Sequence, residues 1–221
     1  MSSAPAKKIA GLYNGVWSQY MVYTSEKYSP FFDMVYIGDL EQYDLTKYAA
    51  LYIPFQSNMD GLGERRAQIE SYLNAGGTVI VEGLSDEQFF PFAKWEHRHL
   101  DQDWWMHDKS NYPCTIEEAG KTHPVFRDLS MYHANWHNHG VYTVIPDTAE
   151  VLQKSREGEV VTWTDERRFN GRIFATTQDA LVEMGIGQIR HIDPFLDAVI
   201  EWVTGAKPEG TYLPAPGKAV A

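Results

Sequence analysis

Cysteine, basic residues and long hydrophobic runs are scarce in this chain of 221 residues, and each shortage excludes a class of protein. The single cysteine, Cys114, excludes an intramolecular disulfide and fits a reducing compartment. Lysine and arginine number 19 against 30 aspartates and glutamates, and the net charge of −11 argues against nucleic acid or an anionic membrane as partner. The chain has no apolar run of roughly 18 residues, and no signal-peptide core follows Lys7-Lys8. We therefore expect a cytoplasmic protein that does not span a membrane.

Aromatic residues, by contrast, are abundant at 14% of the chain, with seven Trp and thirteen Tyr. Many of them fall in Trp95–Trp105 and Tyr132–Tyr142, two stretches that also contain most of the histidines. Aromatic rings supply core volume, but they also form the walls of ligand sites.

The first 84 residues alternate between strand-like and helix-like segments. Lys7–Asn14, Asp33–Asp39, Ala49–Phe55 and Thr78–Gly83 predict strands, and the nearly continuous apolar run Ala49–Phe55 is expected to be buried on both faces. A helix is predicted between the last two of these strands by the spacing of Leu62, Ile69, Tyr72 and Leu73. This order indicates βαβ units, and hence a mostly parallel sheet covered by helices on both faces.

The remainder of the chain predicts a single domain over residues 1–205 with an irregular, aromatic- and His-rich insertion at about 85–125. Strands are expected at 141–145, 149–153, 160–163 and 172–176. A final helix should follow, with Asp193 as its N-cap and Gly205 at its end. Residues 206–221, rich in Pro, Gly and Ala, predict an extended tail.

Three stretches carry a resemblance to a known superfamily. The first is Tyr48–Glu82, a buried strand and a helix followed by "NAGGTVIVEG" (residues 74–83). The second is His123–Leu129 ("HPVFRDL"), followed by Trp136–Tyr142 ("WHNHGVY"). The third is Phe169–Ala180 ("FNGRIFATTQDA"), followed by a helix ending "IEWVTG". The chain resembles class I glutamine amidotransferase-like proteins, and among them the ThuA-like (trehalose-utilisation) branch. The resemblance implies a flavodoxin-like three-layer α/β sandwich with a mostly parallel central sheet, and a context of carbohydrate metabolism.

The catalytic cysteine of the amidotransferases is absent. Their G-x-C-x-G turn reads Gly83-Leu84-Ser85-Asp86-Glu87 here, and their late His–Glu pair is replaced by Gln178-Asp179. Cys114 lies far along the chain, so the sequence predicts that glutamine is not hydrolysed by a cysteine nucleophile. Ser85 is a candidate nucleophile in its place, and the alternative is that it caps a short helix.

Polar residues follow several predicted strands at the carboxyl edge of the sheet, where open α/β sheets bind ligands. Carboxylates, amides and aromatic faces together suit a polyhydroxylated ligand, although a solvated crown of loops would carry similar residues. The candidate acid–base or nucleophilic residues are Glu82, Ser85, Asp179 and His137, and the candidate ligand-binding residues are Tyr13, Asn14, Gln56, Asp86, Trp105, His139 and Gln178.

Histidines also suggest a metal site. His137 and His139 have the spacing of one side of a strand, and His133 and His137 that of one helical face. Imidazole suits zinc and other divalent metals, with His97, His99 or His107 available to complete a site. The alternative is that these histidines form hydrogen bonds within a polar loop.

The sequence thus predicts a ThuA-like domain that binds a sugar or similar polar metabolite, with any turnover being hydrolytic or acid–base. Two alternatives remain open: a serine hydrolase that uses Ser85, and a non-catalytic structural or regulatory subunit. Two-fold dimers are the commonest assemblies, and the aromatic insertion and the tail are suited to lie against a neighbour, so we expect a homodimer.

Overall fold

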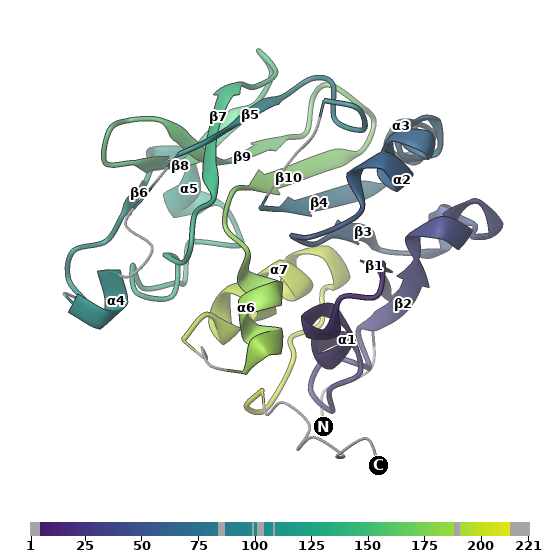
Figure 1. Ribbon diagram of the computed structural model, residues 1–221, viewed down its shortest axis with the longest axis horizontal. Helices are drawn as coiled ribbons and strands as arrows, with labels where there is room; N and C mark the ends of the chain where they lie inside the picture. The colour runs from purple at the N-terminus through teal and green to yellow at the C-terminus, as the bar shows by residue number, and fades with distance from the viewer. Residues whose placement is uncertain are drawn as a thin grey trace.

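The computed structural model describes residues 5–83, 87–98, 100, 104–107, 109–187 and 191–212, without the side chains of Trp105 and His107. Ten strands of the described chain form one mixed sheet (Figure 1). They are β1 (Ile9–Tyr13), β2 (Phe32–Tyr36), β3 (Ala50–Ile53), β4 (Thr78–Glu82), β5 (Lys94–His97), β6 (Cys114–Ile116), β7 (Gly140–Val144), β8 (Glu150–Ser155), β9 (Val160–Asp165) and β10 (Arg172–Thr176).

The parallel half of the sheet has the order β2-β1-β3-β4-β10. Strand β9 then pairs antiparallel with β10, and β8, β7, β6 and β5 continue the sheet in antiparallel pairs. The chain order reverses between β1 and β3, which makes the carboxyl ends of these strands the expected place for a ligand.

Side-chain alternation explains why the central strands are covered on both faces. In β3, Ala50 and Tyr52 pack into one hydrophobic core, whereas Leu51 and Ile53 pack into the other. Successive side chains of a strand point to opposite faces, so a continuous apolar run needs a helical layer on each side. The parallel sheet predicted from these runs is confirmed.

Helices provide the two outer layers (Figure 1). One layer contains α1 (Trp17–Tyr23), α6 (Ala180–Ile186) and α7 (Asp193–Thr204), and the other contains α2 (Met59–Glu64), α3 (Arg66–Asn74) and the 3-10 turn η1 (Ile37–Gln42). A second 3-10 turn, η2 (Leu45–Lys47), precedes β3. The region predicted as an irregular insertion contains β5, β6 and two short helices, α4 (Trp104–His107) and α5 (Glu118–Thr122).

The start of α7 differs from the prediction. Ile192, rather than Asp193, occupies the N-cap position, and Asp193 is the first helical residue. Its carboxylate accepts a hydrogen bond from the Tyr212 amide at 3.1 Å and lies 3.7 Å from the Lys27 ammonium. Asp193 therefore holds the segment after α7 instead of capping the helix, whereas Gly205 ends α7 in the left-handed conformation as expected.

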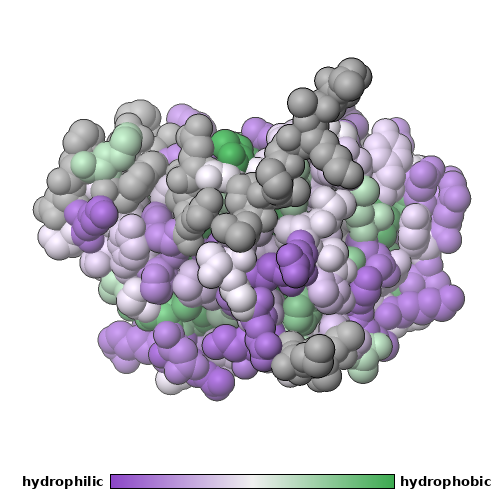
Figure 2. Space-filling view, turned by 90° about the horizontal axis from the view of Figure 1, so that it is seen from below, coloured by the Kyte–Doolittle hydropathy of each residue, from purple (hydrophilic) through white to green (hydrophobic). Residues whose placement is uncertain are grey.

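Viewed from the side of α1, α6 and α7, the surface is largely hydrophilic with separate small hydrophobic areas (Figure 2). The exposed apolar side chains of these helices include Trp17 and Ile186. Among the described residues, none of the helices is long and apolar enough to cross a membrane.

Candidate functional site

Glu82 ends β4 at the carboxyl edge and is almost wholly buried. One of its carboxyl oxygens accepts a hydrogen bond from the Leu181 amide at 3.1 Å, which ties β4 to the start of α6. Burial raises the pKa of Glu82 to about 8, and the nearby Asp179 adds to the rise, while the Tyr52 hydroxyl and the Leu181 amide oppose it. Glu82 is therefore a mostly protonated acid at neutral pH.

The backbone turns sharply directly after Glu82. Gly83 has a φ of +74°, and a Cβ on this residue would lie 2.4 Å from the Phe55 ring. Only glycine combines this conformation with so close an approach. The turn thus lets Phe55, which follows β3, reach across the end of β4.

Asp179 and His139 form a hydrogen-bonded pair at the carboxyl edge of the sheet. The imidazole Nε2 of His139 lies 2.8 Å from Oδ2 of Asp179, and the Asp179 side chain is only 1% exposed against 23% for His139. Phe55 stacks on the imidazole with ring centroids 4.1 Å apart, which fixes the ring plane. Burial raises the pKa of Asp179, whereas the hydrogen bond from His139 acts against that rise. A buried carboxylate that orients a partly exposed imidazole is an arrangement suited to general acid–base chemistry.

A second histidine lies beside this pair. His137 stacks on the buried Trp136 ring, and its Nδ1 lies 3.4 Å from a carboxylate oxygen of Glu183. His137, Asp179 and Glu183 each offer one ligand atom, and these atoms lie within 4.8 Å of one another. Glu183 was not identified from the sequence, and this group of possible metal ligands does not include His139. The segment around these histidines is not helical, so the helical spacing of His133 and His137 has no role.

The point between β1 and β3 where the strand order reverses also lies at the carboxyl edge of the sheet. Asn14 donates from its amide to the Gln56 carbonyl at 3.2 Å, while its own side-chain oxygen is buried and has no hydrogen-bond partner among the described residues. Gln56 is exposed and has a φ of +64°, a backbone conformation that residues other than glycine rarely adopt. Backbone strain of this kind gathers at functional sites.

Aromatic rings extend from this point along α1. The ring of Trp17 stacks on that of Tyr20 with centroids 5.7 Å apart, and Tyr20 in turn lies 6.5 Å from the half-buried Tyr13. Trp17 is 63% exposed, which is unusual for so large an apolar side chain. We call Tyr13, Trp17 and Tyr20 the aromatic platform. The sequence pointed to Tyr13 but not to the other two, because α1 was not predicted.

The remaining predicted site residues have separate positions. Gln178 is fully buried, and its amide donates to the Ala134 carbonyl and to Oε1 of Gln153. Its contacts are therefore with buried groups of the protein below the carboxyl edge. Ser85, Asp86 and the Trp105 side chain lie outside the described residues. Cys114 is buried, and burial raises the pKa of its thiol to about 12, which makes it a poor nucleophile as expected.

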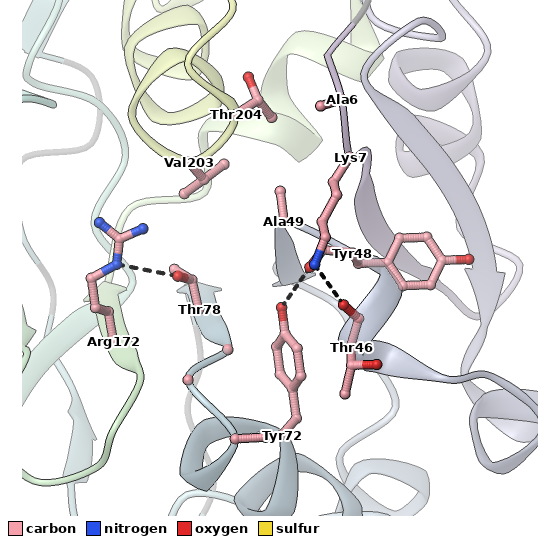
Figure 3. A pocket seen from close by; sticks show the side chains of 13 residues that line it. Ala6, Lys7, Thr46, Tyr48, Ala49, Tyr72, Thr78, Arg172, Val203 and Thr204 are labelled. Carbon is pink, nitrogen blue, oxygen red and sulfur yellow. Dashed lines mark hydrogen bonds between the residues drawn. The ribbon is translucent and has the colours of Figure 1, made fainter.

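A cavity of about 450 Å³ lies at the opposite edge of the sheet, where β3, β4 and β10 begin (Figure 3). Lys7 donates from its ammonium to the Thr46 carbonyl at 2.8 Å, and Arg172 donates to the Thr78 hydroxyl at 3.3 Å. This basic cavity is distinct from the acidic and aromatic carboxyl edge, which alone contains the described candidate site residues.

Comparison with known proteins supports the fold but does not identify a reaction. No family model matches the sequence, and no curated protein does. Among solved structures, a cytoplasmic protein from Salmonella typhimurium LT2 matches with a TM-score of 0.57 and 10% identity, over 89% of this chain and 99% of the other. A protein from Thermoplasma acidophilum, assigned as part of a GMP synthase, matches with a TM-score of 0.52 and 15% identity, over 89% of this chain and 96% of the other.

A third match is the cold-adapted β-galactosidase from Rahnella sp. R3, with a TM-score of 0.52 and 13% identity over 91% of this chain but only 32% of the enzyme. Identities this low are informative about architecture alone. Together with the strand order, the structural matches show that the chain has a class I glutamine amidotransferase-like fold, a three-layer α/β sandwich around a mostly parallel sheet.

Proposed function

We propose that this chain is a ThuA-like domain that binds a sugar or a similar polar metabolite at the carboxyl edge of the sheet, with His139 as its general acid–base. The observation that carries the proposal is the hydrogen bond of 2.8 Å between the buried Asp179 and the partly exposed His139. The pairing holds the imidazole in one orientation while leaving it open to a ligand hydroxyl. The ThuA-like motifs give the carbohydrate context.

The aromatic platform supports a ligand with both apolar and hydroxyl faces. Trp17 and Tyr20 offer flat, exposed rings, on which the C–H face of a sugar would pack. Asn14 follows Tyr13 in the chain and donates to the Gln56 carbonyl, and the amide of the exposed Gln56 can both donate to and accept from hydroxyl groups. Such a division into a stacking wall and a polar wall is typical of polar-ligand sites.

A thermal-shift screen of mono- and disaccharides and sugar acids tests the proposal. A ligand that binds only the native state raises the apparent melting temperature with its concentration. Trp17→Ala should remove the shift, whereas Met34→Ala, which also truncates an exposed apolar residue, should keep it. His139→Gln should retain binding but lose turnover, with His97→Ala as the control for an exposed histidine. Absence of a shift with every sugar would refute the proposal and favour a non-catalytic role.

A serine hydrolase is the second candidate, favoured by two features of the described edge. The left-handed Gly83 produces a sharp turn after β4, two residues before Ser85, and His139–Asp179 supplies an oriented base at the same edge. This candidate predicts that a fluorophosphonate probe labels the protein, and that Ser85→Ala and His139→Gln both abolish labelling. Labelling that persists in Ser85→Ala would exclude Ser85 as the nucleophile.

A further inference from the structure

Two carboxylates, one at the N-cap of α6 and one within the helix, lie one helical turn apart. Asp179 immediately precedes α6 and Glu183 lies four residues later, one helical turn along, as the hydrogen bond from the Glu183 amide to the Asp179 carbonyl at 3.2 Å shows. Like charges at this spacing destabilise a helix. Within the described part of the chain, neither carboxylate forms an ion pair with lysine or arginine, so the nearby imidazoles are the only groups there that can pair with them as cations.

The unbonded oxygen of Asp179 points to a missing cationic partner. Asp179 is 1% exposed, its Oδ2 is bonded to His139, and its Oδ1 is buried with no hydrogen-bond partner in the described structure. A buried acceptor of this kind is destabilising unless another group compensates for the water it has lost. A bound cation would supply that compensation.

His137 gives the cluster the donor set of a transition-metal site. Its Nδ1 lies 3.4 Å from the Glu183 oxygen, which is the separation of about 3.4 Å that two ligands have around a tetrahedral metal bound at about 2.1 Å. The three ligand atoms all lie within 4.8 Å of one another. One imidazole and two carboxylates favour zinc or a neighbouring divalent metal over the hard ions magnesium and calcium.

We propose that His137, Asp179 and Glu183 bind one divalent transition-metal ion, of which Zn²⁺ is the best fit. The side chains of His137 and Glu183 are 17% and 16% exposed, so solvent can reach the cluster and a water or ligand would supply the fourth coordination position. His139 then acts as a positioning residue, because its hydrogen bond to the second oxygen of Asp179 orients the ligand carboxylate. The inference does not depend on the identity of the organic ligand.

Isothermal titration of the full chain, first stripped with EDTA, tests this site with ZnCl₂, MnCl₂ and MgCl₂. We expect one zinc ion per chain, weaker binding of manganese and no saturable binding of magnesium at comparable concentration. Glu183→Gln and His137→Ala should each weaken zinc binding at least 10-fold, and His139→Phe, which retains a ring over Phe55, should weaken it roughly 10-fold.

Two control variants separate this site from adventitious binding by surface residues. Glu64→Gln changes an exposed carboxylate on α2, and His97→Ala removes an exposed imidazole on β5, so neither should alter the zinc affinity. Circular dichroism confirms that each variant is folded. Absence of stoichiometric zinc binding, or equal affinity in Glu183→Gln and the parent protein, would overturn the inference. Sugar binding to the metal-free protein would leave the proposed function standing in that case.

Discussion

Glu82 should make the stability of this protein fall as the pH rises from about 5 to 8. Its ordinary pKa of 4.5 applies in the unfolded chain, and burial raises it to about 8 in the folded one. Between these values the native state binds more protons than the unfolded state, so raising the pH favours unfolding. The contribution is fully present below pH 4.5 and is lost as the pH passes through 8.

The magnitude follows from the pKa difference. Each pKa unit corresponds to about 1.4 kcal/mol, so the Glu82 contribution to the free energy of unfolding should decrease by about 3 kcal/mol between pH 5 and pH 8. Glu82→Gln removes this titration while keeping an oxygen that accepts from the Leu181 amide. The variant should therefore gain about 3 kcal/mol relative to the parent protein over the same interval.

Urea denaturation followed by tryptophan fluorescence at both pH values, with EDTA present, measures this difference. Other groups titrate in the same interval, so the informative quantity is the change in the variant-minus-parent free energy, compared at unchanged m-value. Glu64→Gln, an exposed carboxylate on α2, serves as the control and should show no such change. Parallel curves for Glu82→Gln and the parent protein would show that Glu82 titrates near its ordinary pKa and would refute the reasoning.

Three further predictions concern stability. Burial, assisted by Arg172, lowers the pKa of His123 to about 4, so the protein should lose about 3 kcal/mol as the pH falls from 6.5 to 4, and His123→Asn should flatten this loss in urea titrations. An equal pH dependence of the free energy of unfolding in His123→Asn and the parent protein would contradict this prediction. Gln56 has a φ of +64°, so Gln56→Gly should be at least as stable as the parent and Gln56→Val about 1 kcal/mol less stable; equal midpoints would argue against strain. A Cβ on Gly185 would lie 2.0 Å from the Ser18 carbonyl oxygen, so Gly185→Ala should cost about 1–3 kcal/mol, and an unshifted melting temperature would contradict that.

The fold could be predicted largely because the central strands are buried on both faces. Continuous apolar runs such as Ala50–Ile53 and Val79–Val81 have few alternatives to a buried strand. Helices α1 and α6 were missed for the opposite reason. Both helices have only seven residues and α1 has no side-chain capping hydrogen bond, so their stability comes from packing against each other and the sheet.

The same difference explains which residues of the candidate site could be predicted from the sequence. Glu82, Asp179 and His139 could be predicted because they lie at or near the ends of strands, and strand ends meet at the edge of a sheet. Glu183 and Trp17 could not, because their positions depend on the two helices that local sequence does not specify. The homodimer and the role of the tail after residue 205 stay predictions.

The packing of α1 against α6 also decides the geometry of the proposed metal site. Gly185 lets the Ser18 backbone approach α6 closely, and Glu183 lies only two residues before Gly185 on this seven-residue helix. His137, in contrast, belongs to a segment that the His139 amide anchors through its bond to the carbonyl of Thr177, the residue directly after β10. A displacement of α6 therefore changes the distance between Glu183 and His137 without altering either ligand. Cores resist such displacement because they are close-packed, so a single glycine in the helix interface helps to set the ligand separation of 3.4 Å at the carboxyl edge.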